Sequence, residues 1–443
     1  MKTTSQSPIH FSPVMQNLKT SPTLAINERV QELWAEGEQV YHFGFGESRF
    51  PVHPKMQAAL AANAHQKSYL PGRGLPALRE QIAAFYSVQL GMAVSSEQVI
   101  VGPGSKSLMY ALRMALDGAL ILPTPAWVSY APQSHLLNRP VYRIPASPRD
   151  GYALTMDAVQ ETVEQVAEEA KILLITSPNN PTGHMFEAAF LSELADFCRQ
   201  EGIVVLSDEI YSLVPHGQKP HISLVRYYPE GTIVLGGLSK YLSLGGWRLG
   251  VGILPKSEDG RILMQNLHAI ASEIWSTPTA PVQYAALTAY SDDPDIANYI
   301  AECAAIHAAR TQHLWSWLVE LGISCPQPEG GFYLISNFDR WREPLAQRDV
   351  HTSLDLAKYL LDNYHIATLP GSAFGTPERD LSLRIATSYV DMETDEAAEK
   401  ILEVWRQEAT SSTREGEQFM TQNHPHMAAA ISRFQQFIQD LEV

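Results

Sequence analysis

Short apolar runs alternate with longer amphipathic stretches through the middle of the chain. The longer stretches, such as residues 107–116 and 186–200, repeat apolar residues every three or four positions, as helices covering a core do. Five short runs bounded by turn-forming residues predict buried strands: 99–101, 119–122, 172–176, 203–206 and 231–235. Strands alternating with helices predict an α/β fold with a mostly parallel sheet. Because such sheets bind ligands at the carboxyl ends of their strands, polar residues just after each run are candidate site residues.

A second, smaller α/β unit is predicted beyond a long helical run over residues 282–320, which breaks near 292–294. Its strands and helices are expected at 332–335, 353–363, 381–385 and 394–407. Ahead of the large unit we expect a helix over 26–36 and a strand that enters a glycine-rich turn at 44–51. The predicted regions are an N-terminal arm with part of the small domain (1–50), a large domain (51–315), a small C-terminal domain (316–407) and a helical C-terminal extension (408–443).

Both ends of the chain are polar and lack a core pattern. Residues 1–20 and 408–425 are expected to be loose. The last stretch, 428–441, repeats apolar residues on one helical face and is expected to pack on the body of the protein or on a partner subunit.

Composition excludes several classes of function. The 443 residues carry 32 basic and 48 acidic side chains, a net charge of −16, which argues against nucleic acid and anionic membranes as partners. No window reaches the ~20 apolar residues of a membrane span, and the N-terminus lacks an apolar signal core. Cys198, Cys303 and Cys325 are far apart and form no metal-ligand pattern, so we expect no disulfide framework and no metal site. A cytoplasmic protein is the expectation.

Lys240 is the most informative residue of the chain. It follows the strand at 231–235 among glycines and apolar residues, where desolvation favours the neutral amine that attacks a carbonyl. Arg248, eight residues later, either lowers the pKa of that amine further or binds an anion. Both needs are met if the anion is the phosphate of an aldehyde cofactor on Lys240. An ordinary solvated loop lysine is the alternative.

Two further strand ends carry residues suited to a flat, phosphorylated ligand. Gly104-Ser105-Lys106 opens a helix and offers backbone N–H groups, a hydroxyl and a cation to a phosphate, although a plain helix cap explains it equally well. Trp127 follows the strand at 119–122, where its indole either stacks on a cofactor ring or packs in the core.

Polar residues in three other strands complete a set. Asn180 lies in a proline-flanked turn that holds its amide rigidly. Asp208 ends a strand at a depth where a carboxylate needs a cation, such as a pyridinium N–H, and Tyr211 follows three residues later. Arg384 lies within an apolar strand and matches either a substrate carboxylate or a structural ion pair. Together these residues describe pyridoxal phosphate acting on an amino acid.

The sequence resembles the class I/II aminotransferases of the fold type I pyridoxal-phosphate enzymes, over about residues 21–407. Three motifs carry the resemblance: Asn180-Pro181-Thr182-Gly183, Asp208-x-x-Tyr211, and Ser239-Lys240 with Gly246-Trp247-Arg248-x-Gly250. The resemblance implies a large cofactor-binding domain, a smaller α/β domain and a homodimer with shared active sites. It implies that Lys240 bonds to pyridoxal 5′-phosphate and moves the substrate proton. The implied cofactor contacts are Tyr69 (from the partner subunit), Gly104, Ser105, Lys106, Trp127, Asn180, Asp208, Tyr211, Ser239 and Arg248, and the implied contacts of the substrate α-carboxylate are Gly46, Asn180 and Arg384.

The sequence departs from the family pattern at two places. Gly237 stands where many members have serine. The turn that is Gly-Glu-Pro-Asp-Phe-like in relatives reads Gly46-Glu47-Ser48-Arg49-Phe50. Arg49, together with Lys106, suggests a substrate with an acidic side chain, but a phosphate contact and a surface charge explain them as well.

The implied function is a ping-pong transamination between an L-amino acid and a 2-oxo acid. A pyridoxal-phosphate lyase, cyclase or synthase on the same scaffold is the alternative, because the cofactor residues are shared. A non-catalytic sensor is disfavoured by the presence of both Lys240 and Arg384.

Overall fold

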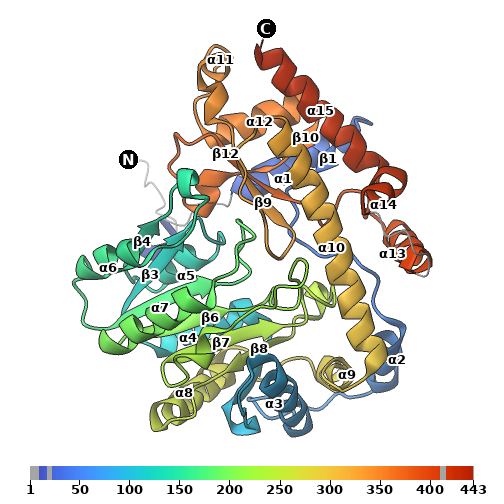
Figure 1. The fold of residues 1–443 in the computed structure, drawn as a ribbon. Coiled ribbons are helices and arrows are strands. Elements are labelled where there is room, and N and C mark those ends of the chain that lie inside the picture. The colour runs from blue at the N-terminus through green and yellow to red at the C-terminus, as the bar shows by residue number, and fades with distance from the viewer. Residues whose placement is uncertain (1–8, 17–21, 410–415, 443) are drawn as a thin grey trace, which may run out of the picture.

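Seven strands form the central sheet of the protein, in the order β2-β8-β7-β6-β5-β3-β4 (Figure 1). The structure, a computed structural model, describes residues 9–16, 22–409 and 416–442. The strands are β2 (Val99–Gly102), β3 (Ala119–Thr124), β4 (Val141–Pro145), β5 (Lys171–Thr176), β6 (Val204–Asp208), β7 (Thr232–Gly237) and β8 (Gly250–Ile253). Only β8 runs antiparallel to its neighbours in this sheet. The predicted α/β fold with a mostly parallel sheet is confirmed.

Alternate residues of the central strands pack against helices on opposite faces. Ile172 and Leu174 of β5 join the core beneath α4 and α8, whereas Leu173 and Ile175 join the core beneath α6 and α7. Both faces are therefore apolar, which explains why these strands appear in the sequence as unbroken apolar runs. The flanking helices are α4 (Ser105–Ala115), α5 (Tyr130–Leu136), α6 (Met156–Glu164), α7 (Ala188–Gln200) and α8 (Glu258–Ile274). Near the edge strand β2, α3 (Pro76–Leu90) packs with α9 (Ala280–Ala289). Helix α9 in turn contacts α2 (Pro54–Asn63).

A smaller layer lies beside the central sheet and contains the second group of strands. It contains a three-stranded antiparallel sheet in the order β11-β12-β9 and a parallel pair of β1 with β10. These strands are β1 (Tyr41–His42), β9 (Tyr333–Asn337), β10 (Ile366–Ala367), β11 (Leu369–Pro370) and β12 (Ser382–Ala386). The helices of this region are α1 (Pro22–Ala35), α11 (Arg342–Ala346), α12 (Ser353–Tyr364) and α13 (Asp395–Ala409). Helix α10 (Pro294–Glu320) runs from the central sheet to this smaller layer (Figure 1).

The C-terminal extension is more ordered than its sequence suggests. Residues 416–423 form α14, so the expectation of a loose segment over 408–425 is wrong for this part, and residues 410–415 lie outside the described chain. Helix α15 (Pro425–Glu442) buries Ile431, Phe434 and Leu441, the apolar face that the sequence predicts. It packs on α10, α11, α12 and β1, which means that it covers the smaller layer.

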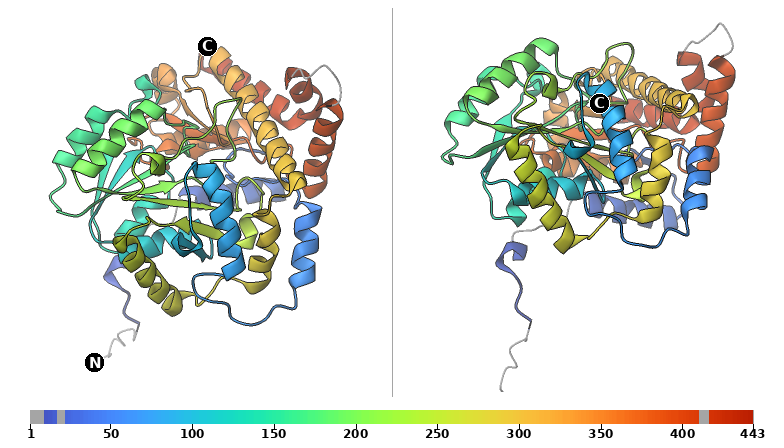
Figure 2. Two further views of the ribbon diagram at one scale, coloured as in Figure 1. Left: turned by 60° about the horizontal axis from the view of Figure 1, so that its bottom comes forward. Right: turned by 90° about the horizontal axis from the view of Figure 1, so that it is seen from below.

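Some elements of the structure differ from what the sequence pattern predicts. Strands β4 and β8 were not predicted, because β8 reads Gly-Val-Gly-Ile and β4 is a half-exposed edge strand. Residues 1–8 and 17–21 of the expected loose arm lie outside the described chain, while residues 13–16 form a short 3-10 helix that contacts α5, and residues 9–12 lead away from the body of the molecule (Figure 2). Within the described residues, the structure contains no helix that is both long and apolar enough to span a membrane.

Candidate active site

One cavity collects nearly all of the site residues expected from the sequence. It has a volume of about 450 Å³ and opens where β5, β6 and β7 end and where antiparallel β8 begins. Its lining includes Gly46, Ser105, Lys106, Trp127, Asn180, Asp208, Tyr211, Ser239, Lys240, Arg248 and Arg384. Because β8 is antiparallel, Arg248, which precedes it, reaches the same edge of the sheet as residues that follow the parallel strands.

Lys240 projects from the loop after β7 and is half-buried. Its Nζ donates a hydrogen bond to the Gly46 carbonyl at 2.6 Å. The ammonium also lies 5.6 Å from the centre of the Tyr211 ring and 5.8 Å from that of Phe332. The amine is thus held over aromatic faces by a backbone oxygen rather than by a carboxylate.

Asp208 is the last residue of β6 and lies at the floor of the cavity. Only 4% of it is exposed, and burial raises the pKa of its carboxyl to about 6. Two donors oppose that effect: the Tyr130 hydroxyl at 2.8 Å and the backbone N–H of Ile210 at 3.3 Å. Asp208 precedes a turn rather than a helix, so it is not a helix cap. A buried carboxylate without an ion-pair partner among the described residues suits a cationic N–H of a ligand.

The start of α4 and the Arg248 side chain form a cationic corner of the cavity. Gly104 precedes α4 with φ +89°, and a Cβ at this position would collide with the Arg248 guanidinium. No side chain caps this helix start, which leaves backbone N–H groups free for an anion. Lys106 lies in the first turn, and partial burial, Arg248 and Lys240 all lower the pKa of its ammonium. This corner therefore fits a phosphate, with Gly104 supplying close approach rather than a side chain.

Aromatic and amide groups line the middle of the cavity. Trp127 is half-buried, with the Lys106 Nζ 4.7 Å from its ring centre. The Asn180 side chain is 5% exposed, and its Oδ1 has no hydrogen-bond partner in the described chain. The Tyr211 hydroxyl lies 2.8 Å from the Tyr333 hydroxyl. The Asn180 Oδ1 therefore has no partner among the described residues and is available to a ligand, and the hydroxyl-bearing Tyr211 and Tyr333 line the same cavity.

Arg384 is a buried cation without a protein anion. It lies in β12 and is 4% exposed, with its guanidinium between the rings of Tyr333 and Phe374 at 5.0 and 5.2 Å. Its Nη2 donates to the Gly44 carbonyl at 2.7 Å, while Nε has no partner. Burial lowers the pKa of this guanidinium. No carboxylate of the described chain pairs with it, so the alternative of a structural ion pair is not realised among the described residues and an external carboxylate fits.

Some predicted residues lie elsewhere. Tyr69 is 88% exposed and lies outside the cavity of its own chain. Arg49 interacts with Asp395 at 3.6 Å and does not line the cavity. Gly237 has φ +150°, and a Cβ there would lie 2.6 Å from the Leu249 carbonyl oxygen, so a serine would not fit this backbone.

Two tyrosines that line the cavity, Tyr130 and Tyr333, are not among the residues expected from the sequence. Tyr130 donates to Asp208 and lies 2.6 Å from the Thr176 hydroxyl. Tyr333 donates to the Gly46 carbonyl at 3.1 Å and contacts Tyr211 and Arg384. Tyr130 follows Trp127 by three residues and Tyr333 follows the Gly330-Gly331 turn, which places both near candidate residues in the chain but does not indicate their hydrogen-bond partners.

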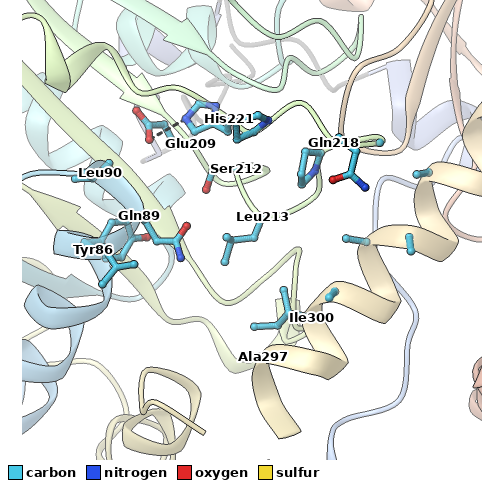
Figure 3. A pocket seen from close by; sticks show the side chains of 18 of the residues that line it. Tyr86, Gln89, Leu90, Glu209, Ser212, Leu213, Gln218, His221, Ala297 and Ile300 are labelled. Carbon is cyan, nitrogen blue, oxygen red and sulfur yellow. Dashed lines mark ion pairs between the residues drawn. The ribbon is translucent and has the colours of Figure 1, made fainter. Parts of the chain in front are cut away.

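A second cavity, of about 680 Å³, is lined in part by residues that follow β6, including Glu209, Ser212 and Leu213 (Figure 3). Glu209 lines it, whereas Asp208 lines the first cavity, and the Glu209 carboxylate pairs with His221 Nε2 at 3.1 Å. The Ser207 hydroxyl also donates to Glu209, at 2.8 Å. None of the predicted site residues lines this cavity, so its larger size does not make it the candidate site.

Comparison with known proteins identifies the family. Residues 38–401 match the family described as aminotransferase class I and II. The chain belongs to the class I and II aminotransferases. An aspartate aminotransferase of Geobacillus stearothermophilus is 34% identical over 87% of this chain and 96% of its own length. A probable aspartate/prephenate aminotransferase of Aquifex aeolicus is 30% identical over 82% of this chain and 91% of its own.

The fold of a solved aminotransferase agrees with that of this chain. The aspartate aminotransferase of Thermus thermophilus, in a single-mutant form, superimposes with a TM-score of 0.78 at 24% identity and covers 90% of this chain and 99% of its own. The protein is therefore an aminotransferase, and pyridoxal 5′-phosphate is its cofactor. The residues present fit this group, because a buried carboxylate, an unsatisfied amide oxygen and an uncapped helix start face one cavity. Among the described residues no cluster of side chains could hold a metal ion.

Proposed function

We propose that this aminotransferase uses L-amino acids with an acidic side chain as amino donors. The observation that carries the proposal is that two cations of the cavity, Arg384 and Lys106, form no ion pair with any carboxylate of the described chain. Arg384 would bind the substrate α-carboxylate through its guanidinium. Lys106 would bind the side-chain carboxylate. The names of the relatives from Geobacillus and Aquifex support this substrate class.

The chain's own groups divide the remaining work. When bound, pyridoxal phosphate supplies an aldehyde and an electron-withdrawing ring. Lys240 would hold it covalently and move the proton at the substrate Cα, because its amine is the base of the cavity. Asp208 would pair with the ring nitrogen, and Asn180 and Tyr211 would bind the ring hydroxyl. Trp127 would stack on the ring, and the phosphate contacts would come from Gly104, Ser105, Ser239 and Arg248.

The exchange would be ping-pong, since one cavity serves both the amino donor and the oxo-acid acceptor. Arg384 and Gly46 would hold the α-carboxylate in each half-reaction. A single half-reaction tests this: the loaded enzyme is mixed with one amino acid without any 2-oxo acid. Conversion of the cofactor to pyridoxamine phosphate with release of the oxo acid is expected for aspartate or glutamate. A donor range restricted to apolar amino acids would exclude the acidic-donor proposal.

Lys106→Met separates the two possible roles of this lysine. If Lys106 binds the substrate side chain, kcat/KM for aspartate falls roughly 100-fold, because truncating one partner of a buried charge pair costs a few kcal/mol, while kcat/KM for alanine hardly changes. If Lys106 binds the phosphate instead, cofactor affinity falls and all donors lose activity together.

Lys240→Ala tests the central assignment. Turnover is expected to disappear, because no other described lysine lines the cavity except Lys106. Far-UV circular dichroism of the variant is expected to match that of the parent. Substantial residual turnover would refute the role of Lys240.

We also propose a homodimer in which Tyr69 reaches the phosphate of the partner subunit. Tyr69 is 88% exposed, and Phe11 and Met15 of the N-terminal arm are 77% and 51% exposed. Such apolar side chains gain from a covering surface. Co-refolding Tyr69→Ala with Lys240→Ala provides the test. A shared site predicts regained activity, because one site of the heterodimer then combines an intact Lys240 with an intact Tyr69, whereas a mixture no more active than its components excludes sharing.

We also propose a division into two domains and a cytoplasmic location. We place the large cofactor-binding domain at residues 51–315 and the small domain at 316–407 with part of 1–50, with α10 passing from one to the other. A cytoplasmic location is supported by the free thiols of Cys198 and Cys303, which are buried and unpaired as in reducing compartments. Limited proteolysis and cell fractionation test these two assignments.

A further inference from the structure

Ser48 connects three segments of the active site through its hydroxyl. The residue is 2% exposed. Its Oγ lies 2.6 Å from the Ser243 Oγ and 2.9 Å from the His307 Nε2. Ser48 belongs to the turn after β1, Ser243 to the loop after Lys240, and His307 to α10. A proline at this position would make neither contact.

His307 is held so that it serves as a fixed partner for Ser48. It is 1% exposed, and its ring lies 4.9 Å from that of Phe50 and 4.6 Å from that of Phe332. Burial and the neighbouring Arg310 lower the pKa of the imidazole well below its usual value, so the ring is neutral. A neutral imidazole either accepts from Ser48 or donates to it, and in both cases Ser48 still bonds to Ser243.

The loop that carries Ser48 and the loop that carries Ser243 also meet at the Lys240 amine. Ser48 lies two residues after Gly46, whose carbonyl accepts from Lys240 Nζ at 2.6 Å, and Ser243 lies three residues after Lys240. Ser243 has φ +57°, a conformation that non-glycine residues seldom adopt without a compensating contact. The serine pair supplies such a contact beside the lysine.

We propose that Ser48, Ser243 and His307 form a positioning contact that holds the Gly46 carbonyl on the Lys240 amine. The contact keeps the amine in place over the cavity whenever it is not bonded to the cofactor, which is the state in which it moves the substrate proton. This inference rests on the role proposed for Lys240. None of the three residues lines the cavity, so they act through Gly46 and Lys240.

Steady-state kinetics give the first test. Ser48→Ala and Ser243→Ala are each expected to lower kcat about tenfold, the effect of one lost hydrogen bond in an active site, with KM for the amino donor changed less than about twofold. Ser48→Thr keeps the hydroxyl and is expected to retain kcat. The double variant is expected to be no slower than either single variant, because both remove the same contact.

The cofactor-free protein gives an independent readout. Acetic anhydride acylates Lys240 only when its amine is not bonded to the cofactor, and the Gly46 hydrogen bond restricts the orientations in which the amine can attack. Mass spectrometry of the Lys240 peptide is expected to show acylation about five- to tenfold faster in Ser48→Ala than in the parent chain. Ser48→Thr is expected to react at the parental rate.

Ser353→Ala is the matched control. Ser353 is fully buried and bonds to the Ser372 hydroxyl at 2.9 Å, and neither serine lines the cavity. Its loss is expected to lower thermal stability as Ser48→Ala does while leaving kcat and the acylation rate unchanged. If Ser48→Ala and Ser243→Ala also keep both rates, the contact is only structural and the inference fails. Loss of turnover in Lys240→Ala would still support the proposed function in that case.

Discussion

Tyr130 donates a hydrogen bond to Asp208, with 2.8 Å between the phenol oxygen and Oδ2. Tyr130 is the first residue of α5, which follows β3, and Asp208 is the last residue of β6. A helix that follows one strand therefore affects the ionisation of a residue on another strand. Burial alone would drive the Asp208 pKa higher than about 6, and the Tyr130 hydroxyl opposes it. The hydrogen bond from Tyr130 thus helps to keep the buried Asp208 carboxyl ionised at neutral pH.

Tyr130→Phe is therefore expected to weaken cofactor binding most strongly at mildly acidic pH. Without the phenol donor the Asp208 pKa rises by roughly one unit, the value of one hydrogen bond to a carboxylate. At pH 8 Asp208 stays mostly ionised in both proteins, whereas at pH 6 the variant is mostly protonated and cannot pair with a cationic ring nitrogen. Equilibrium dialysis of pyridoxal phosphate at both pH values measures this. Tyr142→Phe, on the edge strand β4, is the control, and a loss that does not depend on pH would contradict the explanation.

Asp208→Asn is expected to stabilise the cofactor-free protein while it abolishes turnover. The folded-state pKa of about 6 lies above the ordinary 3.8, so the folded state binds the proton more tightly, and ionisation destabilises the fold as pH rises through this interval. Above pH 7 this amounts to about 3 kcal/mol, which asparagine removes. Urea unfolding at pH 8 should show the gain, and the gain should shrink toward pH 4. The exposed Asp292→Asn serves as the control, and an equal gain at both pH values would point to a cause other than ionisation.

Glu329→Gln is expected to destabilise the contact between the loop that carries Glu329 and residues 184–185, which follow Asn180. Glu329 accepts from the Met185 N–H at 2.8 Å and pairs with Lys219 and His184, which holds its pKa at about 2 despite burial. Since the folded pKa lies below the ordinary 4.5, its contribution is complete above pH 4.5 and disappears as pH falls toward 2. A partly exposed pair contributes about 1 kcal/mol. The free energy of unfolding at pH 7 and at pH 3 measures the effect, and a difference that persists undiminished at pH 3 would argue against this pairing.

Phe434→Ala is expected to lower the free energy of unfolding by about 4 kcal/mol, as for other fully buried phenylalanines. Phe434 has no exposed surface, and its ring lies 6.4 Å from that of Phe43, next to the strand that leads to Gly46. Helix α15 lies beyond the residues that match the family, so this variant tests whether the extension is part of the folded core. Gln439→Ala, on the exposed face of α15, should leave urea unfolding unchanged. A Phe434 variant as stable as that control would show that the extension is dispensable.

The sequence alone determined the α/β layer and the identity of most cavity residues. Buried strands covered on both faces must be continuously apolar, and the turns after them must carry the ligand-binding polar groups, so Lys240, Asp208 and Asn180 could be found from local pattern. Their family motifs are contiguous in the chain, which is why the resemblance was specific.

The tertiary structure decided what depends on packing between distant segments. Arg49 and Lys106 are both basic residues near candidate loops, yet of the two only Lys106 lines the cavity, whereas Arg49 lies beside Asp395 of α13. Tyr130 and Ser48 have no local signal for their roles, since the Asp208 carboxyl and the Ser243 and His307 side chains that they contact are 78 or more residues away. Hydrogen bonds of this kind follow from which elements fold against each other, and the periodicity of a sequence carries information only about the face each element buries.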